Sequence, residues 1–172
     1  MGRYPAGRTA LVVPVPEAEP VVGPWRAALD PSSPYGVPPH VTVMYPFLPS
    51  GEAGRAALGE LFAGFAAFDV VFARCVRLGG LLYLEPSPAE PFARLTGAVT
   101  ARWPRAIPYG GKHGEALPHL SIGYDGGEAR FDEASAAIEP GLPVRSRVTT
   151  VRLVEFDGTT WRTVEDFPLS AA

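Results

Sequence analysis

Two short stretches of the sequence share a pattern in which a histidine stands two residues before a hydroxyl residue. The first is HVTV, with His40 and Thr42, and the second is HLSI, with His119 and Ser121. Both stretches are short, apolar and flanked by proline, which predicts strands. Because side chains alternate across a strand, each imidazole shares a face with its hydroxyl, and the intervening apolar residues point to the opposite face.

An imidazole and a hydroxyl from each of two strands suit phosphodiester chemistry. One histidine can take a proton from the attacking water or hydroxyl, and the other can protonate the leaving oxygen, since an imidazole pKa of about 6.5 allows both roles. The two hydroxyls can donate hydrogen bonds to the non-bridging phosphate oxygens. In-line displacement places acid and base on opposite sides of phosphorus. We therefore take His40, Thr42, His119 and Ser121 as candidate catalytic residues.

Other reactive centres fit the sequence less well. The three histidines, His40, His113 and His119, lack a common ligand spacing, and no acidic residue stands at the usual offset for a metal site. A serine-based triad lacks the Gly-x-Ser-x-Gly turn that presents such a nucleophile. The sequence predicts no metal ion and no other cofactor.

Strands and helices are expected to alternate around the two histidine stretches. Strand-like runs cover residues 9–15, 68–78, 81–86, 148–156 and 159–169, with hairpin turns at Gly79-Gly80 and Asp157-Gly158. Apolar residues recur at helical spacing in four segments, at Val22, Trp25 and Leu29, at Leu58, Leu61, Phe62 and Phe65, at Phe92, Leu95, Val99 and Trp103, and at Phe131, Ala134 and Ile138. Ser87 is expected to cap the third of these helices, with Pro88 in its first position.

Two parts of the sequence follow the same pattern, which indicates an internal duplication. A shift of 79 residues superposes the two histidine stretches and also carries Gly79 of the first hairpin turn to Gly158 of the second. Each unit then runs β-α-β-α-β, over residues 9–79 and roughly 81–158, with a closing strand at 159–169. The expected fold is a single bilobal α+β domain spanning residues 1–172, in which two face-to-face lobes bring both histidines to one cleft.

Composition excludes several classes of protein. The chain has 172 residues and a net charge of −3, so it lacks the basic excess of a general nucleic-acid binder. No stretch approaches the ~20 apolar residues that cross a bilayer, and no signal peptide is evident. The single cysteine rules out an internal disulfide. We expect a cytoplasmic protein with no obligate protein partner.

The paired stretches HVTV and HLSI resemble the two-histidine (2H) phosphoesterase superfamily, whose hallmark is two copies of His-x-Thr/Ser-x. This group includes bacterial 2′-5′ RNA ligase-like proteins and 2′,3′-cyclic nucleotide phosphodiesterases. The resemblance implies a bilobal α+β fold with antiparallel sheets around a central cleft and no requirement for a metal. It also implies that His40 and His119 form the acid–base pair and that Thr42 and Ser121 bind phosphate, without fixing which histidine is the base.

Further residues are candidates for binding substrate. Tyr45, Phe47 and Tyr124 follow the two motifs and can stack on a nucleobase, although packing in the core at a strand end explains them equally well. His113, in the glycine-rich loop before the second motif, can contact a ligand phosphate or simply face solvent. Five arginines lie on the hairpin strands, and one or two of them can reach the cleft, namely Arg74, Arg77, Arg145, Arg147 and Arg152.

The function expected from these residues is hydrolysis of a 2′,3′-cyclic phosphate or a 2′-5′ phosphodiester on a nucleotide or RNA end. Ring opening that leaves phosphate on the 2′ position is what the resemblance implies, and its reversal would appear as 2′-5′ RNA ligase activity. One alternative is a non-catalytic module that binds phosphorylated nucleotides or RNA ends. Another is a hydrolase of a different phosphodiester, such as a nucleotide-sugar or a lipid-derived cyclic phosphate.

Overall fold

The computed structural model describes residues 4–111 and 117–171. The α-helices of this part of the chain are α1 (Glu19–Leu29), α2 (Arg55–Ala63), α3 (Glu90–Arg102) and α4 (Glu128–Ile138). The strands are β1 (Thr9–Pro14), β2 (His40–Phe47), β3 (Phe68–Leu78), β4 (Leu81–Ser87), β5 (Leu120–Tyr124), β6 (Val144–Val148), β7 (Thr150–Phe156) and β8 (Trp161–Pro168).

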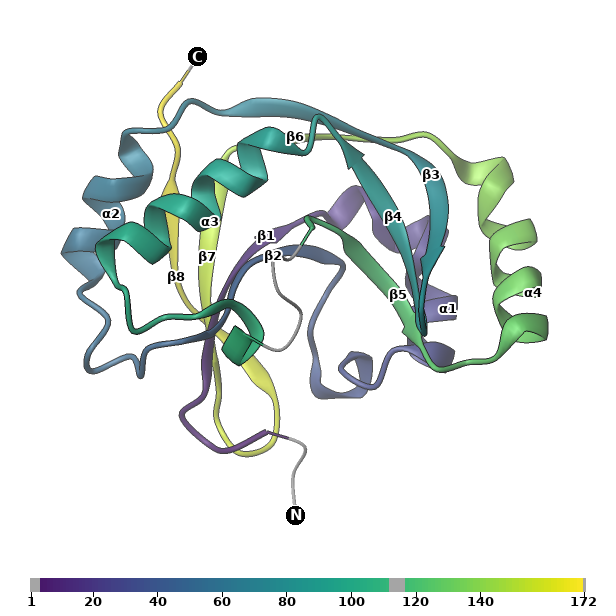
Figure 1. Ribbon diagram of the computed structural model, residues 1–172, viewed down its shortest axis with the longest axis horizontal. Coiled ribbons are helices and arrows are strands. Elements are labelled where there is room, and N and C mark those ends of the chain that lie inside the picture. The colour runs from purple at the N-terminus through teal and green to yellow at the C-terminus, as the bar shows by residue number, and fades with distance from the viewer. Residues whose placement is uncertain (1–3, 112–116, 172) are drawn as a thin grey trace.

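The strands form one curled antiparallel sheet in the order β6-β3-β4-β5-β2-β1-β7-β8 (Figure 1). The two strands that carry the histidine motifs, β2 and β5, are neighbours at its centre. They pair antiparallel through Val41 and Leu120 alone. Four strands therefore lie on each side of a narrow central junction. This arrangement confirms the expected α+β fold class and joins the two halves into a single sheet.

Elements from the two expected repeats are exchanged between the halves of the sheet. Strand β3 comes from residues 9–79 but pairs with β4, on the side of β5. Helix α1 packs on β5, and α3 packs on β2, where Thr96 Oγ1 donates a hydrogen bond of 2.7 Å to the Val43 carbonyl. The division of the chain into units 9–79 and 81–158 stays a prediction, while the exchanged packing ties both halves into one core.

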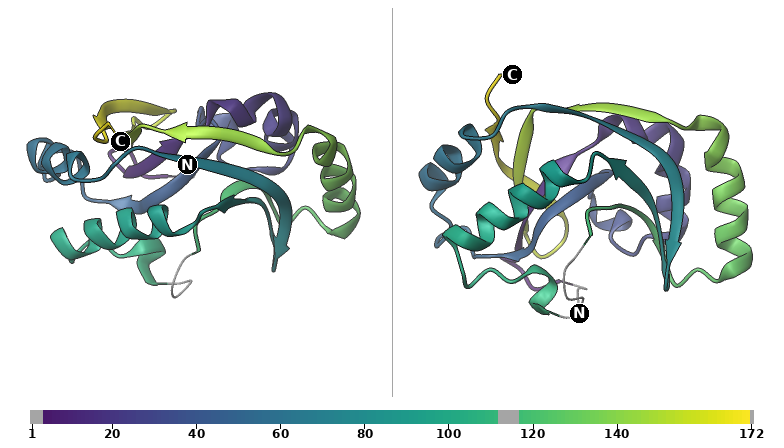
Figure 2. Two further views of the ribbon diagram at one scale, coloured as in Figure 1. Left: turned by 90° about the horizontal axis from the view of Figure 1, so that it is seen from above. Right: turned by 45° about the horizontal axis from the view of Figure 1, so that its top comes forward.

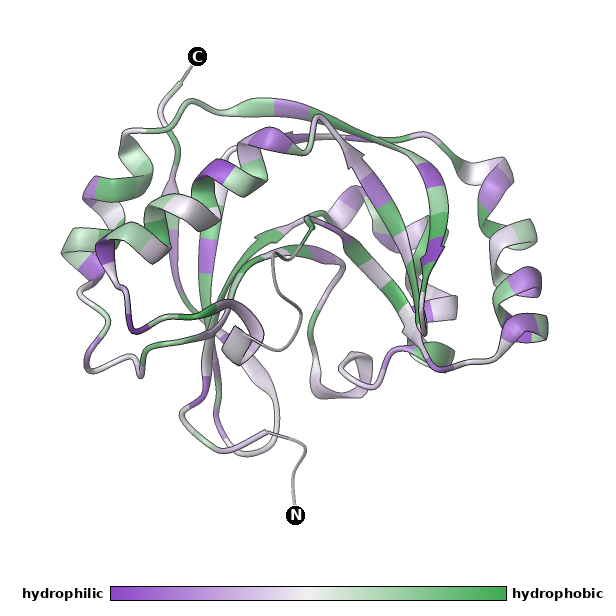
Figure 3. Ribbon diagram, in the orientation of Figure 1, coloured by the Kyte–Doolittle hydropathy of each residue, from purple (hydrophilic) through white to green (hydrophobic). Residues whose placement is uncertain are grey.

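The core lies between the helices and one face of the sheet. In β2, Val41 and Val43 are buried there, and in β5, Leu120 and Ile122 are fully buried in the same cluster. The apolar stretches of β1 and β2 are visible in Figure 3. Alternation therefore sends the histidine and hydroxyl of each motif to the opposite face, which is the arrangement that the sequence predicts.

Two local expectations are corrected by the structure. Ser87 does not cap a helix, because it ends β4, and α3 begins at Glu90 after Ala89 with no side-chain cap. Strand β6 was not expected, although it pairs with β3 from Phe68↔Val148 to Phe72↔Val144 along the edge of the sheet seen in Figure 2.

Both expected hairpins are confirmed, and Gly79 adopts the left-handed φ of 57° that its tight turn requires. Among the described helices, none is long and apolar enough to cross a membrane.

Candidate active site

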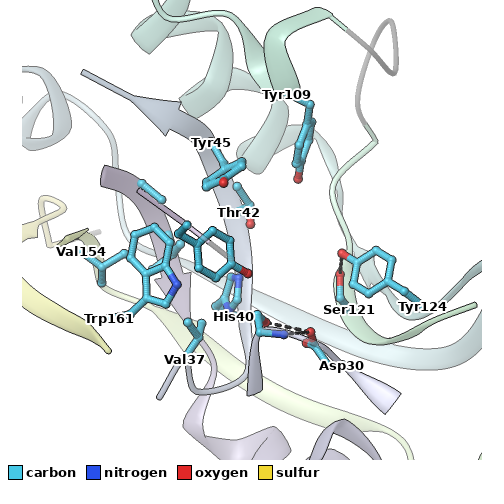
Figure 4. Close-up of a pocket in the computed structure, with 14 residues that line it drawn as sticks. Asp30, Val37, His40, Thr42, Tyr45, Tyr109, Ser121, Tyr124, Val154 and Trp161 are labelled. Carbon is cyan, nitrogen blue, oxygen red and sulfur yellow. Dashed lines mark hydrogen bonds between the residues drawn. The ribbon is translucent and has the colours of Figure 1, made fainter. Parts of the chain in front are cut away.

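The exposed face of the central strands borders a pocket with a volume of about 270 Å³ (Figure 4). Its wall includes His40 and Thr42 from β2 and Ser121 from β5. The second histidine, His119, immediately precedes β5 and is half-buried beside Tyr83, with ring centroids 5.8 Å apart. The structure thus brings the motif hydroxyls of both halves to one pocket.

Both motif histidines are oriented by the same local hydrogen bond. His40 Nδ1 lies 2.8 Å from the Pro38 carbonyl oxygen, and His119 Nδ1 lies 2.7 Å from the Leu117 carbonyl oxygen. A carbonyl oxygen can only accept, so each Nδ1 carries a proton and donates it. In the neutral ring, Nε2 is then the basic nitrogen. The repeated bond fixes one tautomer in both halves of the molecule, which is what acid–base chemistry at Nε2 requires.

Burial sets the charge state of His40. The desolvation of its ring lowers the pKa from 6.5 to about 4, against the opposing effect of the hydrogen bond to Pro38. The Arg26 guanidinium lowers this pKa further, the Asp30 carboxylate raises it, and His119 lowers it. His40 is therefore neutral at pH 7, in the form that accepts a proton.

A buried ion pair supports this wall of the pocket. Arg26 and Asp30, near the end of α1, are 2 % and 4 % exposed, and their charged groups lie 3.2 Å apart. The Asp30 carboxylate also accepts hydrogen bonds from the backbone N–H and the hydroxyl of Ser32, at 2.8 and 2.7 Å. The negative charge of the Asp30 carboxylate is thus balanced by Arg26, and its oxygens already accept hydrogen bonds, so Asp30 contributes to the shape of the pocket wall.

An irregularity in β2 turns Tyr45 toward the pocket. Leu11 of β1 pairs with Met44, whereas the next residue pairs with Thr42, so Val43 is an extra residue. Val43 and Met44 both point into the core. Strict alternation would have placed Tyr45 on the core face with Val43, but the bulge shifts it to the face of Thr42.

The same irregularity recurs in β5. Ser121 pairs with Tyr83 of β4 and Gly123 with Leu82, so Ile122 is the extra residue, 79 positions after Val43. The shift places Tyr124 beside Ser121, and their hydroxyl oxygens are 2.9 Å apart. Both bulges therefore present a tyrosine to the pocket at matching positions of the duplicated pattern.

Aromatic residues line much of the remaining wall. The set consists of Tyr4, Tyr45, Tyr109, Tyr124 and Trp161. Sequence reasoning missed Tyr4, Tyr109 and Trp161 because they lie outside the motifs. One signal could have found Tyr109, since it precedes His119 by ten residues just as Asp30 precedes His40, and both line the pocket.

Phe47 and the arginines do not line this pocket. Phe47 is 6 % exposed and packs edge-on against Trp103, with ring centroids 5.5 Å apart, so it does not line the pocket. His113 lies outside the described residues. Of the five arginines, none lines this pocket, but Arg152 lines a smaller neighbouring pocket that also includes His40. Arg145 and Arg147 lie on β6 and not on a hairpin strand. Four of the five form ion pairs with acidic side chains: Arg74 with Glu85, Arg77 with Asp132, Arg147 with Asp69 and Arg152 with Asp166.

Metal-ligating side chains do not gather in this part of the molecule. Within residues 4–111 and 117–171, no group of three or more histidine, cysteine, aspartate or glutamate side chains is placed to hold a metal ion. The described residues offer two imidazoles at neighbouring strands, of which His40 lines the pocket and His119 lies beside Tyr83, together with several hydroxyls on the pocket wall.

Comparison with solved structures gives the class of fold. Escherichia coli LigT in complex with 3′-AMP matches with a TM-score of 0.64 and 17 % identity, over 96 % of this chain and 99 % of that one. Protein TT0787 of Thermus thermophilus matches with a TM-score of 0.59 and 20 % identity, over 95 % and 98 % of the two chains. A structure described as a phosphoesterase matches with a TM-score of 0.59 and 18 % identity, over 96 % and 99 %. The fold is thus that of LigT.

The family follows from the sequence. The model of the 2′-5′ RNA ligase superfamily matches residues 13–160, which include both histidine motifs, and the chain belongs to this superfamily of 2H phosphoesterases. The resemblance seen in the two motifs is thereby confirmed. A search among curated proteins gave no match.

Proposed function

We propose that the protein is a phosphoesterase that opens the 2′,3′-cyclic phosphate of a nucleotide or a short RNA end by paired-histidine acid–base catalysis. The observation that carries this proposal is the matched pair of imidazoles at the two central strands. Each is fixed by the same Nδ1 hydrogen bond, at 2.8 and 2.7 Å, and each is accompanied by a motif hydroxyl at one pocket.

The reaction needs one proton to be removed and one to be supplied. The Nε2 of one histidine accepts a proton from water as the water oxygen forms a bond to phosphorus. The bond from phosphorus to the ribose 3′ oxygen breaks, and the other histidine donates a proton to that oxygen. Thr42 and Ser121 donate hydrogen bonds to the non-bridging oxygens, where negative charge is held throughout. The product carries its phosphate on the 2′ oxygen.

We assign the role of base to His40 and that of acid to His119. Burial holds the pKa of His40 at about 4, so its ring is neutral and can accept a proton at pH 7. The step leaves His40 protonated and His119 neutral, and exchange with solvent restores the starting state. The same step with a 5′ hydroxyl in place of water would join it to the 2′,3′-cyclic end through a 2′-5′ linkage, as a lesser ligase activity, with His40 again the base and His119 again the acid. In the reverse of that step the ribose 3′ hydroxyl attacks phosphorus, and the two histidines exchange roles.

The pocket wall supports a nucleoside as the carrier of the phosphate. Tyr45 and Trp161 stand beside apolar residues of β1 and β7, and their rings offer the flat surfaces on which a base stacks. A volume of about 270 Å³ suits a small ligand such as one nucleotide. The E. coli LigT structure with 3′-AMP, which shares this fold, is consistent with that choice.

The proposal is tested by hydrolysis of the four nucleoside 2′,3′-cyclic monophosphates in excess EDTA. We expect turnover by the wild type and a loss of about a hundredfold or more in H40A and in H119A. T42A is expected to lose about tenfold or more, whereas T100A, which removes an exposed hydroxyl of α3 outside the pocket, serves as the matched control and is expected to keep full activity.

The other outcomes identify which part of the proposal is wrong. A wild type that is inert on all four substrates but binds them contradicts hydrolysis and leaves a binding module. Activity on a 2′-5′ dinucleotide alone would move the substrate from the cyclic phosphate to that linkage. Activity that EDTA abolishes, or that survives in H40A and H119A, contradicts the paired-histidine mechanism.

A further inference from the structure

Each motif hydroxyl has a tyrosine hydroxyl as its neighbour. Tyr124 Oη is 2.9 Å from Ser121 Oγ, and the phenol of Tyr109 points toward Thr42 across the pocket (Figure 4). An interaction with the Thr42 hydroxyl lowers the pKa of Tyr109 against the larger, opposing effect of burial. The two tyrosines come from different local structures, since Tyr124 ends β5 and Tyr109 lies in the short turn Pro108–Gly111. The same pairing therefore arises twice, by different routes.

The backbone at Tyr109 is unusual for its residue type. Its φ of 53° and ψ of 27° are left-handed, and Gly110 and Gly111 continue the turn with φ values of 62° and 80°. A bulky aromatic residue is rarely found in this region, because its Cβ crowds the backbone. The strained residue is also the one that projects into the pocket and packs against Tyr45, with ring centroids 6.2 Å apart. Such strain is typical of functional positions.

We propose that Tyr109 and Tyr124 are positioning residues that orient the motif hydroxyls toward the phosphate. Each phenol donates its proton to the oxygen of the motif hydroxyl, Tyr109 to Thr42 and Tyr124 to Ser121. The motif hydroxyl then directs its own proton to a non-bridging phosphate oxygen. The inference rests on the proposed function and adds two residues, one for each half of the sheet, that the motifs do not contain.

The chemistry of the two hydroxyls decides the direction of donation. A phenol is the stronger acid and the better donor, and an aliphatic hydroxyl rotates freely to suit its partners. Burial raises the pKa of Tyr109 to about 12, so this phenol keeps its proton across the neutral range and remains a donor. A hydroxyl that accepts one hydrogen bond donates a stronger one, which polarises the motif hydroxyl toward the anion.

Double-mutant cycles test the pairing. In hydrolysis of 2′,3′-cyclic AMP, Y109F is expected to lower kcat/KM about tenfold, mainly through kcat, in the wild-type background. In the T42A background Y109F is expected to change kcat/KM by less than about twofold, whereas in the S121A background it keeps its tenfold effect. Y124F should show the opposite pattern, silent with S121A and additive with T42A. Y35F, a phenol outside the pocket wall, is the matched control, and melting temperatures verify that each variant is folded.

Two results would overturn the proposal. One is an unchanged kcat/KM in Y109F, and the other is an equal loss from Y109F in the wild-type, T42A and S121A backgrounds, as a general structural effect would give. If the wild type does not turn over cyclic nucleotides, the proposed function fails, and the same cycles are read from calorimetric binding of adenosine 2′-monophosphate. Coupling of Tyr109 to Thr42 alone in that assay supports the pairing, and absence of binding or of coupling rejects it.

Discussion

Lowering the pH from 7.5 to 4.5 is expected to destabilise the protein through His40. Burial lowers the pKa of this ring in the folded state to about 4, whereas the unfolded chain has its ordinary value of 6.5. Below pH 6.5 the unfolded state therefore binds the proton more tightly. The stability that His40 contributes is fully present above pH 6.5 and is lost as the pH falls toward 4.

The size of the effect follows from the two pKa values. Linkage between 6.5 and about 4 gives a loss of about 2.5 kcal/mol in the free energy of unfolding at pH 4.5 relative to pH 7.5. The ring is half-buried at the pocket wall, and solvent screens part of the penalty, so we expect about 2 kcal/mol. That is a large fraction of the stability of a typical domain.

Urea denaturation at a series of pH values measures this loss, with H40N as the comparison. An asparagine amide can still donate to the Pro38 carbonyl but does not titrate, so the difference between the two proteins isolates the imidazole. The wild type should lose about 2 kcal/mol more than H40N between pH 7.5 and 4.5. Equal losses, within about 0.5 kcal/mol, would refute the view that burial keeps His40 neutral.

Substitutions at Gly123, Arg26 and Phe47 test the packing around the site by denaturation and kinetics, with Gly97→Ala and Asp30→Leu as comparison variants. Gly123→Ala places a Cβ 2.5 Å from the Cβ of Leu29 in α1 and should destabilise the fold by about 1–3 kcal/mol. Gly97→Ala, which has open space on α3, should instead stabilise the fold by about 0.5–1 kcal/mol. A similar change in stability for both variants would contradict the close contact at Gly123. Arg26→Met leaves the Asp30 carboxylate buried without its cation and should cost about 3 kcal/mol, most of which is regained when Asp30→Leu is added, and no recovery would argue against the ion pair as the cause. Phe47→Leu should lower stability by about 1 kcal/mol with KM unchanged, and a raised KM would instead place Phe47 in contact with substrate.

Local patterns were sufficient to predict the main features of the site. Alternation in two apolar stretches placed His40 with Thr42 and His119 with Ser121, on faces opposite the buried core residues. The shift of 79 residues indicated that the two stretches belong together, and the structure places them on neighbouring strands. These inferences needed only the period of a strand and the repetition of a motif, which are properties of the sequence itself.

Features that depend on distant pairing were not predictable in the same way. The side on which Tyr45 falls is decided by a bulge against β1, and a bulge is set by both strands together. Strand β6 is five residues long and alternates charged and buried positions, so its signal is weak without β3 beside it. Tyr109 reaches the pocket through a left-handed turn, which the sequence marks only by the two glycines that follow.

The central claim is that one imidazole acts as base and the other as acid, and a change of leaving group tests it most directly. The probe is uridine 2′-(p-nitrophenyl phosphate), on which the ribose 3′ hydroxyl attacks phosphorus and nitrophenolate departs from the position that water takes in ring opening. The two histidines then exchange roles, so His119 is the base and His40 faces the leaving group.

Nitrophenolate departs without a proton, so a variant that lacks only the acid for this step should have a rate close to that of the wild type on this probe. The rates of the wild type, H40A and H119A are compared on this probe and on uridine 2′,3′-cyclic phosphate. The account predicts that both variants are impaired on the cyclic phosphate, and that on the probe H40A recovers to within about tenfold of the wild type while H119A stays impaired by about a hundredfold or more. Equal impairment of both variants on both substrates would contradict the division of acid and base between the two histidines.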